Sequence, residues 1–190
     1  MGRRTLLALD IALKVVLLAL LAYAVLNPDL PQYNGKAMLG RALTFPIAAF
    51  LVPAVWWLRY RDRPYPVDVD LLLTAPFVID VAGNALGLYD SIEWWDDANH
   101  FFNWMLITAA AALVLRSTGS GRLICFGLAL GFAALTAIAW ELAEYVTFIR
   151  DSPELDTAYL DTLGDLTLGT LGGALGAAIV GLWAPGRRML

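Results

Sequence analysis

Residues 94–115 read WWDDANHFFNWMLITAAAALVL. The stretch holds the single histidine of the chain, His100, one helical turn after Asp96 and Asp97, and it continues into a run of mostly apolar residues. A helix over residues 98–115 nearly reaches the length of about 20 residues that crosses a hydrocarbon core. The stretch therefore predicts a membrane-spanning helix that begins among charged groups.

The composition of the whole chain agrees with this prediction. Of the 190 residues, 59% are hydrophobic and 16% are charged, and the mean hydropathy is +0.65. Soluble domains carry about a quarter of charged residues, so we expect lipid to be the solvent of this chain. The net charge of −4 argues against nucleic acid as a partner. The single cysteine, Cys125, excludes an intrachain disulfide and a cysteine-based metal cluster.

Apolar stretches separated by short loops rich in Pro, Gly, Ser and Asn recur along the chain. They cover residues 6–26, 39–60, 67–88, 98–115, 122–149 and 160–183. We therefore predict an all-α polytopic membrane protein, a six-transmembrane-helix bundle that forms a single domain over residues 1–190. The first stretch also has features of a signal peptide, but it is long for one and contains Asp10 and Lys14 at i,i+4 spacing, so we expect a retained helix.

Basic residues predict the orientation of the bundle. Nine of the 13 Lys and Arg residues fall on one side of the predicted spans. They are Arg3, Arg4, Arg59, Arg61, Arg63, Arg116, Arg122, Arg187 and Arg188. The positive-inside rule makes this side cytoplasmic, so both termini are expected in the cytoplasm of a multi-pass protein of the cell (inner or plasma) membrane.

Polar side chains enter four consecutive predicted spans at similar depths below the outer surface. They are Asp80 and Asn84, His100 with Asp96 and Asp97 before it, Glu141 and Glu144, and Asp161 and Asp165. A carboxylate that faces lipid is costly, so we expect these groups to point inward to one shared pocket. Arg41, at the outer start of its span, is the nearest candidate counter-charge.

One imidazole with several carboxylates is an oxygen-rich ligand set that suits Mg²⁺, Mn²⁺, Ca²⁺ or Zn²⁺. The expected metal ligands are His100, Glu141, Glu144, Asp161 and Asp165. The expected catalytic residues are Asp96, Asp97 and His100, with one of the two aspartates orienting the imidazole. Asp80, Asn84 and Arg41 are expected to line the polar pocket. Simpler interpretations exist for single residues: Asp96 and His100 as an interfacial pair, and Asp161 as a first-turn acid favoured by the helix dipole.

Small residues and prolines predict how the helices pack. Gly169, Gly172, Gly173 and Gly176, and likewise Gly127 and Gly131, follow the small-xxx-small spacing of close helix contacts. Pro46 and Pro53 predict a kink in the second span.

The polar motifs have a characteristic order: Asp-x-x-x-His-Phe at 96–101, Glu-x-x-Glu at 141–144, and Asp-Thr-x-Gly-Asp at 161–165 before a Gly-rich helix. This order resembles the YjdF-like bacterial inner-membrane proteins and, more distantly, the VanZ-like proteins, over roughly residues 65–183. The resemblance implies a polytopic membrane fold and supplies no reaction. Asp97 doubles the acid of the first motif, so either aspartate could partner His100.

Three functions are compatible with these features. The first is a metal-dependent enzyme that acts in the outer leaflet on a lipid or lipid-linked envelope substrate. The second is a proton- or cation-coupled small carrier that uses the same acids as its relay. The third is a non-enzymatic membrane subunit with a structural or partner-binding cluster. Membrane lipids are expected partners in each case, and the sequence does not indicate an oligomeric state.

Overall fold

The computed structural model describes residues 2–183, apart from the side chains of residues 148 and 154, and it contains helices and no strand in this range. Its helices are α1 (Arg3–Leu26), α2 (Met38–Ala49), α3 (Leu51–Val55), α4 (Val67–Ala85), α5 (Leu88–Ser91), α6 (Trp95–Ser117), α7 (Arg122–Glu144) and α8 (Ala158–Ala177). Wider π-helical turns prolong α3, α7 and α8 over Trp56–Tyr60, Tyr145–Ile149 and Ala178–Trp183. Short 3₁₀ segments form Pro31–Tyr33 and Pro153–Asp156. The predicted all-α class is confirmed for the described residues.

Four helical segments of the described chain are long and apolar enough to cross a membrane. They are Arg3–Leu26, Trp95–Ser117, Arg122–Thr147 and Ala158–Trp183. A fifth span is obtained if Met38–Ala49 and Leu51–Tyr60 are taken together across a bend of 41°. Pro46 and Pro53 flank the break at Phe50, and proline cannot donate the helical hydrogen bond, so the predicted kink is confirmed. The helix α4 carries three aspartates and does not belong to these five spans.

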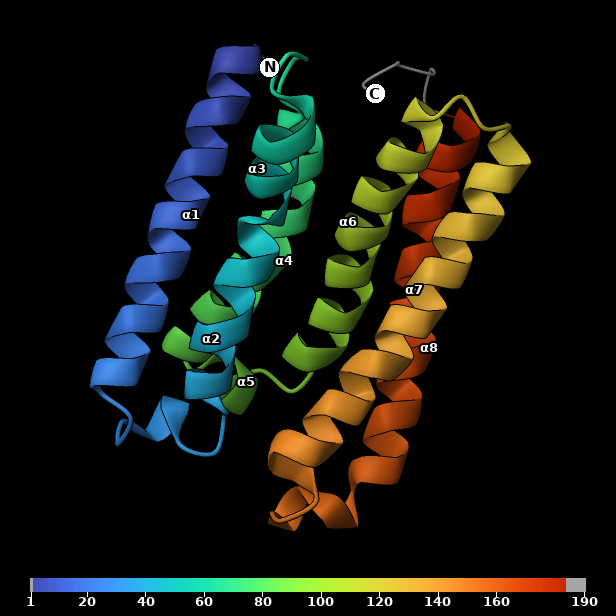
Figure 1. Ribbon diagram of the computed structural model, residues 1–190. Helices are drawn as coiled ribbons and strands as arrows, with labels where there is room; N and C mark the ends of the chain where they lie inside the picture. Colours follow the sequence, from blue (N-terminus) through green and yellow to red (C-terminus); the bar gives the residue numbers. More distant parts are fainter. Residues whose placement is uncertain (1, 184–190) are drawn as a thin grey trace.

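The helices form two groups (Figure 1). The first group contains α1 to α5, in which α1 and α2 pack against α4. The second contains α6, α7 and α8, with its most extensive contact between α6 and α8. Contact between α4 and α6 joins the two groups. Any site that uses residues of both groups therefore lies beside the α4–α6 contact.

Glycines of α8 allow its close approach to α6. A Cβ atom at Gly172 would lie 1.9 Å from the carbonyl oxygen of Phe101, and one at Gly176 would lie 2.2 Å from that of Met105. The predicted packing role of the α8 glycines is thus confirmed at these two positions. The same prediction is wrong for Gly127 and Gly131: outside the backbone of α7 itself, no heavy atom of the described chain lies within 4 Å of a Cβ at either position, so no helix packs closely against this face.

A buried ion cluster fastens α1 to α4. The Lys14 Nζ lies 2.6 Å from Asp10 Oδ1, 2.7 Å from Asp70 Oδ2 and 3.3 Å from Thr74 Oγ1. The Tyr65 hydroxyl also donates a hydrogen bond to Asp70. Burial, and then the Asp70 carboxylate, raises the pKa of Tyr65, so this hydroxyl stays protonated as a donor. The predicted pairing of Asp10 with Lys14 is confirmed, and Asp70 extends it to a second helix.

Candidate functional site

The first turns of α6 place a row of polar side chains on one helix face. Asp96, Asn99, His100 and Asn103 are spaced three or four residues apart and therefore lie on neighbouring positions of that face. The Asn99 amide donates to the Trp95 carbonyl at 2.8 Å, and the Asn103 amide donates to Asn99 Oδ1 at 3.1 Å. These two bonds fix the amides beside the imidazole.

Carboxylates from three helices surround His100. Its Nε2 atom lies 3.8 Å from Asp96 Oδ1 and 3.6 Å from Asp165 Oδ1, and its Nδ1 atom lies 3.8 Å from Glu141 Oε1. All three distances exceed hydrogen-bond length. Among the described residues, the buried Nδ1 atom has no hydrogen-bond partner. The imidazole therefore lies among acids without being hydrogen-bonded to any of them.

These residues form two groups with the spacing of metal ligands, and both groups contain His100. One group is Asp96, His100 and Asp165, and the other is His100, Glu141 and Glu144; within each, one ligand atom per residue lies within 4.8 Å of the others. His100, Glu141 and Asp165 are only 7%, 7% and 3% exposed. Carboxylates this deeply buried need a proton or a cation to neutralise them.

A separate ion pair lies on the opposite side of the site. Arg41 Nε donates to Asp80 Oδ2 at 2.9 Å, and the Tyr89 hydroxyl donates to Asp80 Oδ1 at 2.7 Å. Burial, and then the negative charge of Asp80, raises the pKa of Tyr89, which keeps its proton for this bond. The Arg41 guanidinium also donates to the Lys36 carbonyl. Arg41 is paired with Asp80, and its positive charge also attracts Glu144, one of the acids grouped with His100.

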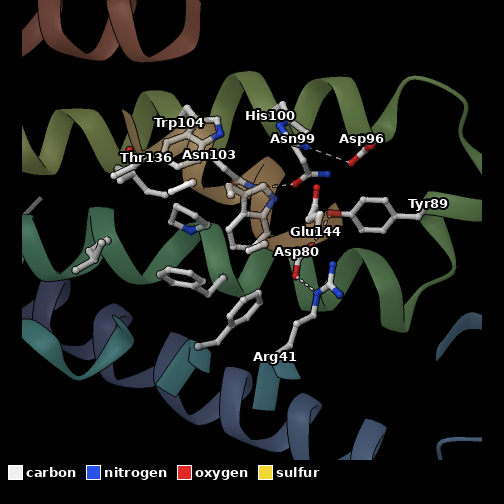
Figure 2. A pocket seen from close by; sticks show the side chains of 18 of the residues that line it. Arg41, Asp80, Tyr89, Asp96, Asn99, His100, Asn103, Trp104, Thr136 and Glu144 are labelled. Carbon is white, nitrogen blue, oxygen red and sulfur yellow. Dashed lines mark hydrogen bonds and ion pairs between the residues drawn. The ribbon is translucent and has the colours of Figure 1, made fainter. Parts of the chain in front are cut away.

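A cavity of about 380 Å³ lies between these two sets of groups. Figure 2 shows Glu144 between Asp80 and His100 at its polar end. The rest of the wall is mostly apolar and includes Phe45, Phe77, Trp104, Phe132 and Trp140. A cavity of this size with a few convergent polar groups and an apolar remainder is typical of a ligand-binding site. One end of the cavity is polar and the rest is mostly apolar, a division that suits an amphiphilic ligand.

A family model supports the membrane assignment of this helical fold. Residues 9–186 match the family described as "Predicted membrane protein (DUF2238)". The chain belongs to this family. No curated protein and no solved structure matches the chain. The family description and the apolar helices together identify a multi-pass membrane protein, and the description contains no activity.

Some of the predicted site residues meet at His100 or the cavity, and others do not. Of the two aspartates before His100, Asp96 faces the imidazole, whereas Asp97 is exposed. Asp161, predicted as a metal ligand, is also exposed and belongs to neither of the two groups around His100. Asn84 is buried, but its amide donates to the backbone of Asp80 and the residue does not line the cavity.

Several cavity residues were not predicted from the sequence. Asn99 and Asn103 line the cavity, and their spacing from Asp96 and His100 on one helix face could have identified them. Tyr89 also lines the cavity. It follows Gly87, whose φ of 65° turns the chain after α4, and no spacing rule applies across such a turn.

Proposed function

We propose that the protein is a metal-dependent enzyme of the cell membrane that acts on a lipid or lipid-linked envelope substrate. The observation that supports this proposal most is the buried imidazole of His100, whose Nδ1 atom lacks a hydrogen-bond partner in the described chain and which has acids on both sides at 3.6–3.8 Å. A divalent cation would neutralise two of the buried negative charges at once.

The proposed membrane topology has six spans with both termini in the cytoplasm. In addition to the five candidate spans, α4 is the sixth span of this topology. Its 19 residues have a length of about 28 Å, close to the thickness of a hydrocarbon core. Its buried charges are compensated inside the bundle, Asp70 by Lys14 and Asp80 by Arg41. The start of α1 and the end of the Ala178–Trp183 segment lie at the same end of the bundle (Figure 1). This topology places His100 in the outer leaflet.

The two ring nitrogens of His100 have different roles in the proposed site. A neutral imidazole has one nitrogen that can bind a metal, while the other carries a proton and donates it. Nε2 faces two carboxylates, Asp96 and Asp165, which makes these three residues the proposed ligands. The Nδ1 proton then faces Glu141 Oε1, and it would orient the ring once the distance of 3.8 Å shortens to hydrogen-bond length. A divalent metal bound by these residues would polarise a water molecule for hydrolysis.

The cavity gives the proposed substrate its access to this site. Glu144 and Asp96 line the cavity and also belong to the two groups around His100. A polar head in the cavity would therefore lie against the ligand set, while its apolar part would contact Phe45, Phe77 and Trp140. This division favours an amphiphile over a small polar solute.

Metal analysis of the protein purified in mild detergent tests the proposal. We expect the wild type to bind a divalent metal and Asp165→Asn to reduce the affinity by more than about 100-fold, because even supporting residues around a metal contribute 10–100-fold. Asp161→Asn, which removes an exposed acid one turn earlier on α8, is the matched control and should keep wild-type metal binding. Absence of metal from the wild type, or equal binding in Asp165→Asn, would refute the proposal.

A proton- or cation-coupled carrier is the second candidate, and one observation favours it. Buried ionisable groups also occur near the other end of α4, where Asp70 contacts Lys14, ten residues or about 15 Å from Asp80. Polar groups at two depths could serve as steps of a relay. Flux driven by a pH or cation gradient in proteoliposomes, abolished by Asp70→Asn, would favour the carrier, and absence of flux would exclude it.

A further inference from the structure

One face of α6 lines two cavities over nearly the whole length of the helix. The first cavity, which contains the His100 site, is lined by Asp96, Asn99, His100, Asn103, Trp104 and Ile107 of this helix. The second is lined by Ile107, Ala110, Ala111, Val114 and Ser117. These positions recur every three or four residues along the helix, so the side chains lie on one face. The face is polar at its start and apolar from Trp104 to Val114.

The second cavity adjoins the first. It has a volume of about 370 Å³, and Leu73, Ile107 and Phe132 line both cavities and so lie at their junction. Beyond the junction the wall is mostly apolar and includes Val52 and Val55 of α3 and the alanines of α6. Apolar cavities do not hold water, so hydrocarbon is the natural occupant of this space inside a membrane.

The second cavity also has access to the surrounding lipid. Its lining residues Leu51, Val55 and Val114 are 50%, 42% and 42% exposed, so they form an apolar rim between the two helix groups. Its other end is lined by Tyr60, Arg63 and Ser117. Along α6, the stretch from Asn103 to Ser117 rises by about 21 Å, more than the roughly 15 Å of one leaflet of the hydrocarbon core. A membrane-lipid chain therefore fits along this face.

We propose that the second cavity binds the acyl chain of a lipid whose polar head lies at the His100 site. The position of the head rests on the proposed function, and the substrate class is then a lipid with an acyl chain. The chain enters sideways past the exposed rim of α3 and α6, and it extends past Ile107 toward Ser117. The junction residues separate the reacting end of the lipid from its hydrocarbon end.

Photolabelling in defined vesicles tests the inference. The protein is reconstituted in phosphatidylcholine vesicles that contain a phospholipid with a diazirine at the end of one acyl chain. We expect labelled peptides to include Ala110, Ala111 and Val114. Ala111→Trp fills the second cavity and should reduce labelling of α6 about tenfold, since overpacking by a large side chain excludes the occupant. Ala111→Leu should reduce it less, in the same direction.

The matched control is Ala19→Trp, which places the same side chain on an exposed position of α1 outside both cavities. It should leave α6 labelling unchanged. Metal content measured on the same samples reports separately on the proposed function: Ala111→Trp should keep its metal, and Asp165→Asn should lose metal and keep its labelling. Labelling confined to exposed outer faces such as that of α1, or equal α6 labelling in wild type and Ala111→Trp, would overturn the acyl-chain site even if metal is bound.

Discussion

Gly172→Ala should disturb the candidate metal site from a position that holds no ligand. The added Cβ would lie 1.9 Å from the Phe101 carbonyl oxygen, whereas real Cβ contacts are essentially never under 3.0 Å, so α6 and α8 must separate by about 1.1 Å at this point. Phe101 follows His100 directly, and Gly172 lies two turns after Asp165. The separation therefore moves the imidazole away from the Asp165 carboxylate. Metal–ligand distances tolerate a change of only about 0.2 Å, which is much smaller than this movement.

The expected result is a loss of stability of about 1–3 kcal/mol, the usual cost of overpacking, together with at least about tenfold weaker metal binding. Thermal unfolding in detergent and metal titration of the same samples would measure the two effects. Gly127→Ala is the matched control, because outside the backbone of its own helix no heavy atom of the described chain lies within 4 Å of a Cβ at that position and the residue is exposed. The reasoning would be refuted if Gly172→Ala bound metal and melted like Gly127→Ala.

Two further substitutions probe the buried charges of the first helix group. Lys14→Met leaves Asp10 and Asp70 buried without their cation and should destabilise the protein by about 3–5 kcal/mol in thermal or denaturant unfolding. Adding Asp70→Asn to this variant should restore part of the lost stability. A melting temperature of Lys14→Met equal to that of the wild type would contradict the assigned pairing. Tyr89→Phe removes a hydroxyl that donates to the Asp80 carboxylate and should cost about 1.5–3 kcal/mol in the same assay, with metal content unchanged.

The helices were predictable because each apolar stretch must satisfy its own backbone in lipid. The predicted spans 122–149 and 160–183 correspond to α7 and α8 with their wider final turns. The start of α6 was predicted three residues late. Asp96 and Asp97 lie before the predicted start, yet acids are favourable in the first turn of a helix, where they complement its dipole. The bend between α2 and α3 follows from Pro46 and Pro53.

The position of each polar residue along its helix could be predicted, but the direction in which its side chain points could not. Residue spacing fixes how far Glu141 and Asp165 lie below a helix end, and the structure brings both to His100. Asp161 shares a helix face with Asp165 at i,i+4 spacing and is nevertheless exposed in the first turn of α8. Which helices are neighbours, and with which faces, depends on the packing of the whole bundle.

The same reasoning explains the opposite outcomes for glycines with equal spacing. A small-xxx-small pattern predicts that a helix can be approached closely, and it does not name the approaching helix. In α8 the pattern meets the backbone of α6 at Gly172 and Gly176. In α7, Gly127 and Gly131 face outward. A helix–helix contact depends on the surfaces of both helices, and the residue pattern of one helix does not identify its neighbour.

The polar residues around the cavity come from two separate helix groups. All residues of the two candidate metal groups belong to α6, α7 and α8, which the α8 glycines hold in close contact. Arg41, Asp80 and Tyr89 belong to the other group, which the Lys14 cluster fastens together. The cavity lies between the two groups. A small displacement of one group against the other would therefore change the width of the cavity while leaving the proposed ligand set intact, so that the proposed lipid could enter and leave without disturbing the residues proposed to bind the metal.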